Sequence, residues 1–68
     1  TPVAIECKWS VSDFDPAGIK AFRKQYPEGE NFVVANDVDR QYTKSYANIK
    51  VSFVSLAGLV KKLSKKML

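Results

Sequence analysis

The chain has 68 residues, enough for one small domain, and its 46% hydrophobic and 26% charged residues are typical of a folded globular protein. It has one cysteine and no histidine, which excludes an internal disulfide, a Cys-His zinc site and catalysis by a histidine-activated nucleophile. The net charge of +4 permits an acidic partner such as DNA without requiring one.

The chain starts with Thr1 and Pro2, and a strand-like apolar run follows at once. We therefore expect a single truncated domain over residues 1–68, taken from a longer protein. No run approaches the roughly 20 apolar residues of a membrane span, and no stretch resembles a signal peptide. These patterns predict a cytoplasmic protein with no membrane partner.

Residues 3–9 predict the first strand, because an apolar series of side chains alternates there with a series that contains both charged residues. Glu6 and Lys8 fall on one face of this strand. Ile5 and Cys7 fall on the other face, and we expect Cys7 to be buried as a small hydrophobic side chain.

The first helix is predicted to begin at Pro16, since Asp15 is a favourable N-cap and proline fits the first helical position. Apolar side chains at helical spacing are expected to face inward, namely Ile19, Phe22 and Tyr26. Basic side chains are expected on the solvent side, namely Lys20, Arg23 and Lys24. Pro27 and Gly29 then end the helix.

Residues 31–36 are a short apolar run that is typical of a strand buried on both faces. Because a helix separates this strand from the first, the two are predicted to form a right-handed parallel βαβ unit. Residues 37–48 are polar without clear periodicity and predict a long surface loop, while residues 49–54 predict a third strand of undetermined direction. Trp9, just after the first strand, is expected to pack against the first helix, or alternatively to cover the mouth of a site.

A last helix is predicted after Ser55, a plausible N-cap. Its apolar stripe comprises Leu56, Leu59, Val60, Leu63 and Met67. Its opposite, basic face comprises Lys61, Lys62, Lys65 and Lys66. The predicted fold class is therefore α/β, with the element order βαββα.

Glu6 and Lys8 are the candidate catalytic residues. A carboxylate and an ammonium on one strand face can hold a divalent cation and stabilise charge on a phosphoryl group. The alternative is an ordinary solvated pair of charges, because the pattern E-x-K often occurs by chance.

The segments VAIECKWS, GIKAFRKQYPEGENFVVAND and IKVSFVSLAGLVKKL resemble the C-terminal nuclease-like domain of a family of bacterial AAA-type ATPases of unknown function. That domain belongs to the PD-(D/E)XK nuclease superfamily, in which E-x-K lies on a core strand followed by a helix and a parallel strand. The resemblance implies a restriction-endonuclease-like fold. It also implies that Glu6 is a metal ligand and Lys8 the lysine of the motif.

In that superfamily the first aspartate of the motif lies on a strand before the E-x-K strand, a position that this chain does not include. The resemblance therefore implies Mg²⁺ in the full-length protein, no cofactor in this chain, and an isolated chain without catalytic activity. ATP would bind only through an upstream domain. The alternative function is a non-catalytic protein-interaction or dimerisation module, in which the sheet edge beside residues 3–9 forms a homo-oligomer or pairs with another strand.

Weaker candidates for DNA contact are basic residues in the polar segment and in the last helix, namely Arg40, Lys44, Lys61, Lys62, Lys65 and Lys66. Tyr42 and Tyr46 lie among the first of these and would suit stacking on bases. The alternative is that both tyrosines pack on the sheet and that the lysines form a solvated face.

Overall fold

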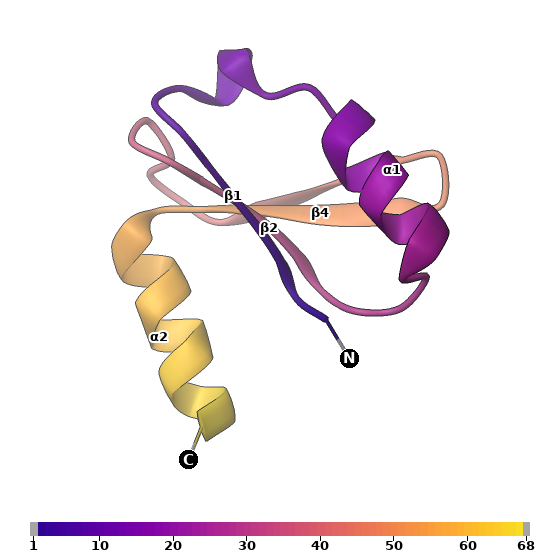
Figure 1. The fold of residues 1–68 in the computed structure, drawn as a ribbon. Helices are drawn as coiled ribbons and strands as arrows, with labels where there is room; N and C mark the ends of the chain where they lie inside the picture. The colour runs from indigo at the N-terminus through magenta and orange to yellow at the C-terminus, as the bar shows by residue number, and fades with distance from the viewer. Residues whose placement is uncertain (1, 68) are drawn as a thin grey trace.

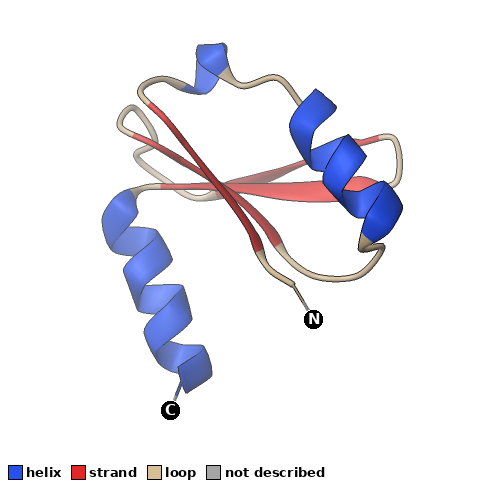
Figure 2. Ribbon diagram, in the orientation of Figure 1, coloured by secondary structure: helices blue, strands red, loops and turns tan. Residues whose placement is uncertain are grey.

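A computed structural model describes residues 2–67 of the chain, with side chains as far as Lys65. It shows a four-stranded sheet with one helix on each face (Figures 1 and 2). The strands are β1 (Ala4–Lys8), β2 (Asn31–Ala35), β3 (Tyr42–Tyr46) and β4 (Ile49–Val54). The helices are α1 (Ala17–Gln25) and α2 (Leu56–Met67), and a short 3-10 helix spans Val11–Asp13. The predicted α/β class is confirmed.

The strand order in the sheet is β1-β2-β4-β3, so β1 and β3 are the two edge strands. β1 pairs with β2 in parallel, which confirms the predicted parallel unit of strand, helix and strand. β4 runs parallel to β2 and antiparallel to β3, which gives the third predicted strand its direction.

The prediction of a surface loop over residues 37–48 is wrong, because β3 lies within this range. β3 forms a hairpin with β4 through a tight turn at Ala47 and Asn48. Ala47 has a φ of 58°, in the left-handed region that such a turn requires. The observed order of strands and helices is therefore βαβββα rather than βαββα.

α1 begins at Ala17, one residue later than predicted. The N-cap residue is Pro16 rather than the predicted Asp15, although Asp15 Oδ1, one residue earlier, accepts a hydrogen bond from the Ala17 backbone N–H at 2.9 Å. At the start of α2 the Ser55 hydroxyl accepts a hydrogen bond from the Gly58 backbone N–H at 3.1 Å, as predicted for an N-cap.

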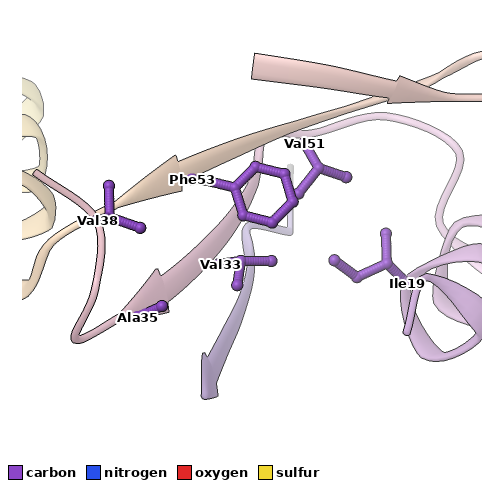
Figure 3. Close-up of a cluster of buried hydrophobic side chains, with 6 residues drawn as sticks. All are labelled: Ile19, Val33, Ala35, Val38, Val51 and Phe53. Carbon is purple, nitrogen blue, oxygen red and sulfur yellow. The ribbon is translucent and has the colours of Figure 1, made fainter. Parts of the chain in front are cut away.

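The sheet separates two apolar clusters, because alternate side chains of β2 point to opposite faces. The larger cluster lies between the sheet and α1 and contains six buried residues (Figure 3): Ile19, Val33, Ala35, Val38, Val51 and Phe53. The smaller one lies under α2 and contains Phe32, Val34, Val54 and Leu59. All five residues of β2 are buried, as the apolar run predicted.

The helices cover less of the sheet than their apolar stripes predicted. In α2, Leu59 is buried and Leu63 packs against it, but Leu56 is 66% exposed and Val60 is 55% exposed. Tyr26, the residue after the end of α1, is also exposed rather than inward-facing. Neither α1 nor α2, as described over residues 2–67, combines the length and the apolar character needed to cross a bilayer.

Arg23 was predicted on the solvent side of α1, and this prediction is wrong, because the side chain is only 6% exposed. Its guanidinium donates five hydrogen bonds, to Asn31 Oδ1 and to the backbone oxygens of Pro2, Tyr26, Glu28 and Glu30. Asn31 in turn donates from Nδ2 to the Lys50 backbone oxygen at 2.9 Å. Arg23 thus ties the end of α1 to Pro2, just upstream of β1, and to the start of β2.

Candidate functional site

The two candidate catalytic residues lie on the same face of β1, the face toward α1. Glu6 is in register with Val33 of β2, and Lys8 is in register with Ala35, and both β2 side chains belong to the cluster beneath α1. Glu6 and Lys8 are each half-buried. The alternation in residues 3–9 therefore predicted their shared face correctly.

Glu6 and Lys8 nevertheless line different hollows. Glu6 lies in an open hollow between β1 and α1 whose other lining residues are mostly apolar. Gly18 of α1 faces it closely, since a Cβ on Gly18 would lie 3.6 Å from Glu6 Oε1. Lys8 lines a second hollow, at the carboxyl ends of β1 and β2, together with Asn36 and Ser55.

Glu6 is the one carboxylate among the residues that line its hollow. Within residues 2–67, no three acidic, cysteine or histidine side chains come close enough to hold a metal ion together. Magnesium keeps its water shell unless several oxygen ligands converge on it. Glu6 alone can therefore supply one ligand to a divalent cation and bind it only weakly.

The opposite face of β1 is exposed, and two predictions about it are wrong. Cys7 was expected to be buried and is exposed, and Trp9 was expected to pack against the first helix and is 80% exposed. Ile5, on the same face of β1 as Cys7, is 45% exposed. The reason is that the apolar cluster under α2 involves β2 and β4, which leaves this face of β1 uncovered.

The backbone edge of β1 that points away from β2 is also free of any strand in the described sheet. We call it the open edge. The Ala4 N–H donates to the Glu30 backbone oxygen on the β2 side at 2.9 Å. Because successive residues of a strand point their backbone groups to opposite sides, Ile5 and Cys7 direct theirs toward the open edge.

The structure distributes the candidate DNA-contacting residues over both faces of the sheet, although Lys61 and Lys65 of α2 line the same hollow. Lys44 lies on β3, and its Nζ is 6.0 Å from the ring centroid of Tyr42 on the α1 face of the sheet. Lys62 lies on the other face, with its Nζ 6.0 Å from the ring centroid of Phe32. Arg40 is exposed between β2 and β3, Lys61 and Lys65 are exposed on α2, and the side chain of Lys66 lies outside the described residues.

The tyrosines of β3 pack on the sheet, as the alternative interpretation expected. Tyr42 stacks on Phe53 with a centroid distance of 4.9 Å and an interplanar angle of 11°. Tyr46 makes an edge contact with Phe14 at 5.6 Å. Tyr42 therefore uses one ring face to pack on the sheet, and Tyr46 packs against the core residue Phe14 through an edge contact.

Asp37 is a polar residue whose role the sequence did not indicate. Its carboxylate accepts hydrogen bonds from the Val11 backbone N–H at 3.0 Å and from the Ser10 hydroxyl at 2.8 Å. The first of these bonds, supported by the second, holds the pKa of Asp37 below its ordinary value. Asp37 thereby fixes the segment after β1, and no local pattern predicts a contact 26 residues apart in the chain.

Comparisons with protein families, with curated proteins and with solved structures find no match to this chain. The geometry of β1 and its surroundings is therefore the basis for assigning a function.

Proposed function

We propose that this chain is a nuclease-like module that carries the Glu6 and Lys8 half of a divalent-metal site and does not cut nucleic acid by itself. The observation that carries the proposal is the position of both side chains on one face of an edge strand. That strand leads through α1 into the parallel strand β2 (Figure 1). This arrangement supports a restriction-endonuclease-like fold with a right-handed crossover.

The chemistry follows from the two residue types. Glu6 would supply one oxygen ligand to Mg²⁺, and Lys8 would stabilise negative charge on a phosphoryl group near the metal. A second carboxylate would have to come from a strand beside the open edge of β1. In the complete protein we expect Mg²⁺ and DNA at this site, and ATP at an upstream domain, in a bacterial cytoplasmic ATPase.

Paramagnetic broadening by Mn²⁺, which replaces Mg²⁺ at oxygen ligands, tests the role of Glu6. We expect amide signals near Glu6, including that of Gly18, to broaden at lower Mn²⁺ concentrations than the rest of the chain. Glu6→Gln should abolish this selectivity, whereas Glu28→Gln, at an exposed residue, should preserve it. Broadening that spreads over other carboxylates and is unchanged in Glu6→Gln would contradict the proposal.

A cleavage assay tests the predicted inactivity. Plasmid DNA incubated with the chain and Mg²⁺ should remain intact, because one carboxylate does not hold the ion in place. Cleavage that disappears in Glu6→Gln would show that the chain has a complete site, and would refute the half-site.

A second candidate function is a protein-interaction module, and the exposed side of β1 favours it. An unpaired strand edge readily recruits another strand, and Ile5 and Trp9 expose apolar surface beside it. Sedimentation at several concentrations tests this function, and a strictly monomeric chain would count against it.

A further inference from the structure

We propose that the open edge of β1 pairs with β1 of a second copy of this chain, antiparallel and with Cys7 on the two-fold axis. The proposal rests on the second candidate function and names its partner. Two four-stranded sheets would then join into one sheet of eight strands. Three features of β1 argue for this partner and this register.

The first feature is charge complementarity. With Cys7 opposite Cys7 of the second copy, Glu6 lies opposite Lys8 of the second copy, and two-fold symmetry repeats the pair. Both side chains are on the same face of β1, so each pair meets on that face. Opposite charges directly across an antiparallel pair are stabilising.

The second feature is that the neighbouring registers are repulsive. In an antiparallel pair, a residue whose backbone groups face the open edge pairs with a residue of the same kind. One strand can therefore slide along the other only in steps that keep such residues opposite one another. One step in one direction places Glu6 opposite Glu6 of the second copy. One step in the other direction places Lys8 opposite Lys8, so the Cys7-centred register is the one flanked by like-charge alternatives.

The third feature is the apolar surface. In the same register Ile5, on the face toward α2, lies nearest to Trp9 of the second copy, and both side chains are exposed in the single chain. Trp9 follows the end of β1 and its backbone oxygen accepts a hydrogen bond from the Asn36 N–H at 3.3 Å, so this contact is made by side chains and does not extend the backbone ladder. Leu56 of α2 lines a hollow together with Cys7 on this face, and it also lines a hollow along α2 with Val60. The exposed apolar surfaces of β1 and α2 are therefore adjacent at Leu56, and pairing would cover the part on β1.

The other edge strand is a poorer partner for β1. β3 carries one charged residue, Lys44, flanked by Thr43 and Ser45. It offers Lys8 no carboxylate and offers Ile5 and Trp9 little apolar surface on the face of Thr43 and Ser45. Pairing of β1 with β3 of another copy would also be heterologous and would generate rings or open filaments rather than a two-fold dimer.

Charge exchange at positions 6 and 8 tests the register. Glu6→Lys and Lys8→Glu should each weaken self-association about tenfold or more, because two attractive pairs become two repulsive ones. An equimolar mixture of the two variants should associate like the unaltered chain, since every cross-strand pair in the mixed dimer is again of opposite charge. The double variant Glu6→Lys/Lys8→Glu should also recover self-association.

The mixture controls for folding, because a misfolded variant would not be rescued by its counterpart. Sedimentation equilibrium under reducing conditions measures each dissociation constant. A chain that stays monomeric overturns both this proposal and the interaction function. Association that ignores the charge variants, or that produces filaments, overturns the proposed pairing and leaves the interaction function standing.

Disulfide formation gives an independent measurement of the register. Facing Cys7 residues would form a hydrogen-bonded pair with Cα atoms about 5.5 Å apart, within the range that a disulfide spans. Oxidised glutathione should accept two electrons and two protons from the two thiols and be reduced to two molecules of glutathione, leaving a covalent dimer. In a Cys7→Ser background, Glu6→Cys and Lys8→Cys chains should cross-link with each other when mixed, and much less with themselves. Equal self-linking of the Glu6→Cys chain would refute the Cys7-centred register.

Discussion

Arg23 offers the most direct test of how this small chain holds β1 in place. All five N–H groups of its guanidinium donate to neutral oxygens, with donor to acceptor distances of 2.7–3.1 Å. Arg23→Met keeps most of the apolar length of the side chain and removes every donor. It therefore isolates the hydrogen bonds from the packing.

The expected cost follows from what each acceptor can do without Arg23. Asn31 is buried, so its Oδ1 would lose its donor away from water, at about 1–3 kcal/mol. The four backbone oxygens belong to exposed residues, so water can replace part of each bond. A total of about 3 kcal/mol is expected for Arg23→Met, and about 2 kcal/mol for Arg23→Lys, which keeps the charge but not the five-donor fork.

These values are large for a chain of 68 residues, whose free energy of unfolding should be roughly 3–10 kcal/mol. Urea unfolding followed by far-ultraviolet circular dichroism measures them, since Trp9 is too exposed to report on the core. Lys24→Met, at an exposed neighbouring position, is the matched control and should change the free energy by about 0.5 kcal/mol or less. If Arg23→Met costs no more than this control, the hydrogen bonds of Arg23 do not stabilise the fold.

Three further substitutions probe the backbone and the acid stability. Gly29→Ala should cost about 2 kcal/mol or more, because a Cβ there would collide with the Pro2 backbone oxygen, lie 2.9 Å from Arg23 Nη1 and Nη2, and require a φ of 134°; unchanged urea unfolding would contradict this. Ala47→Gly should stabilise the chain by up to about 1 kcal/mol, because it relieves a left-handed residue in the hairpin turn, and a lower melting temperature would refute the reasoning. Because hydrogen bonds lower the folded-state pKa of Asp37 from 3.8, they stabilise the fold above that value and lose their effect as the pH falls through the lowered pKa. Asp37→Asn should therefore flatten the fall in unfolding free energy below about pH 4, and an identical acid profile in both proteins would exclude this role.

The parts of the fold that the sequence predicted depend on local patterns. β2 is a continuous apolar run, and β4 alternates between Ile49, Val51 and Phe53 on one face and Lys50 and Ser52 on the other, so both strands follow from composition. The parallel pairing of β1 with β2 was predicted too, because a helix connects them, whereas the direction of β4 was not.

β3 escaped prediction because its stabilising contacts are not local. Its five residues, YTKSY, contain no aliphatic side chain, and its turn has alanine and asparagine where glycine would be the usual signal. What makes this segment a strand is the stacking of Tyr42 on Phe53 and the packing of Tyr46 against Phe14. Phe53 lies on β4, and Phe14 lies far from β3 in the sequence. Neither contact is therefore visible in a local sequence pattern.

In the candidate site, too, local patterns predicted some features, and non-local packing determined the others. Alternation placed Glu6 and Lys8 on one face of β1, and the structure agrees. Alternation did not show that the opposite face would be exposed, because that depends on where α2 packs, and α2 covers β2 and β4. Arg23 was assigned to solvent by its charge, whereas its burial depends on acceptors brought together by the α1–β2 connection.

The two proposals for β1 require the same carboxylate, and this makes them testable against each other. A Glu6 that ligates Mn²⁺ is less able to attract Lys8 of a second copy, so the cation should weaken dimerisation. By thermodynamic linkage, dimerisation must weaken Mn²⁺ binding at each Glu6, and with two such sites in the dimer the loss in the dimerisation constant at saturating Mn²⁺ is the square of the loss per site. Sedimentation with MnCl₂, against NaCl at equal ionic strength to account for screening, measures the first effect, and broadening of the Gly18 signal at low and high protein concentration measures the second. Glu6→Gln should remove the dependence on Mn²⁺. If Mn²⁺ binds at Glu6 and leaves the dimer unchanged in the unaltered chain, then Glu6 does not face Lys8 across the axis and the proposed register is wrong.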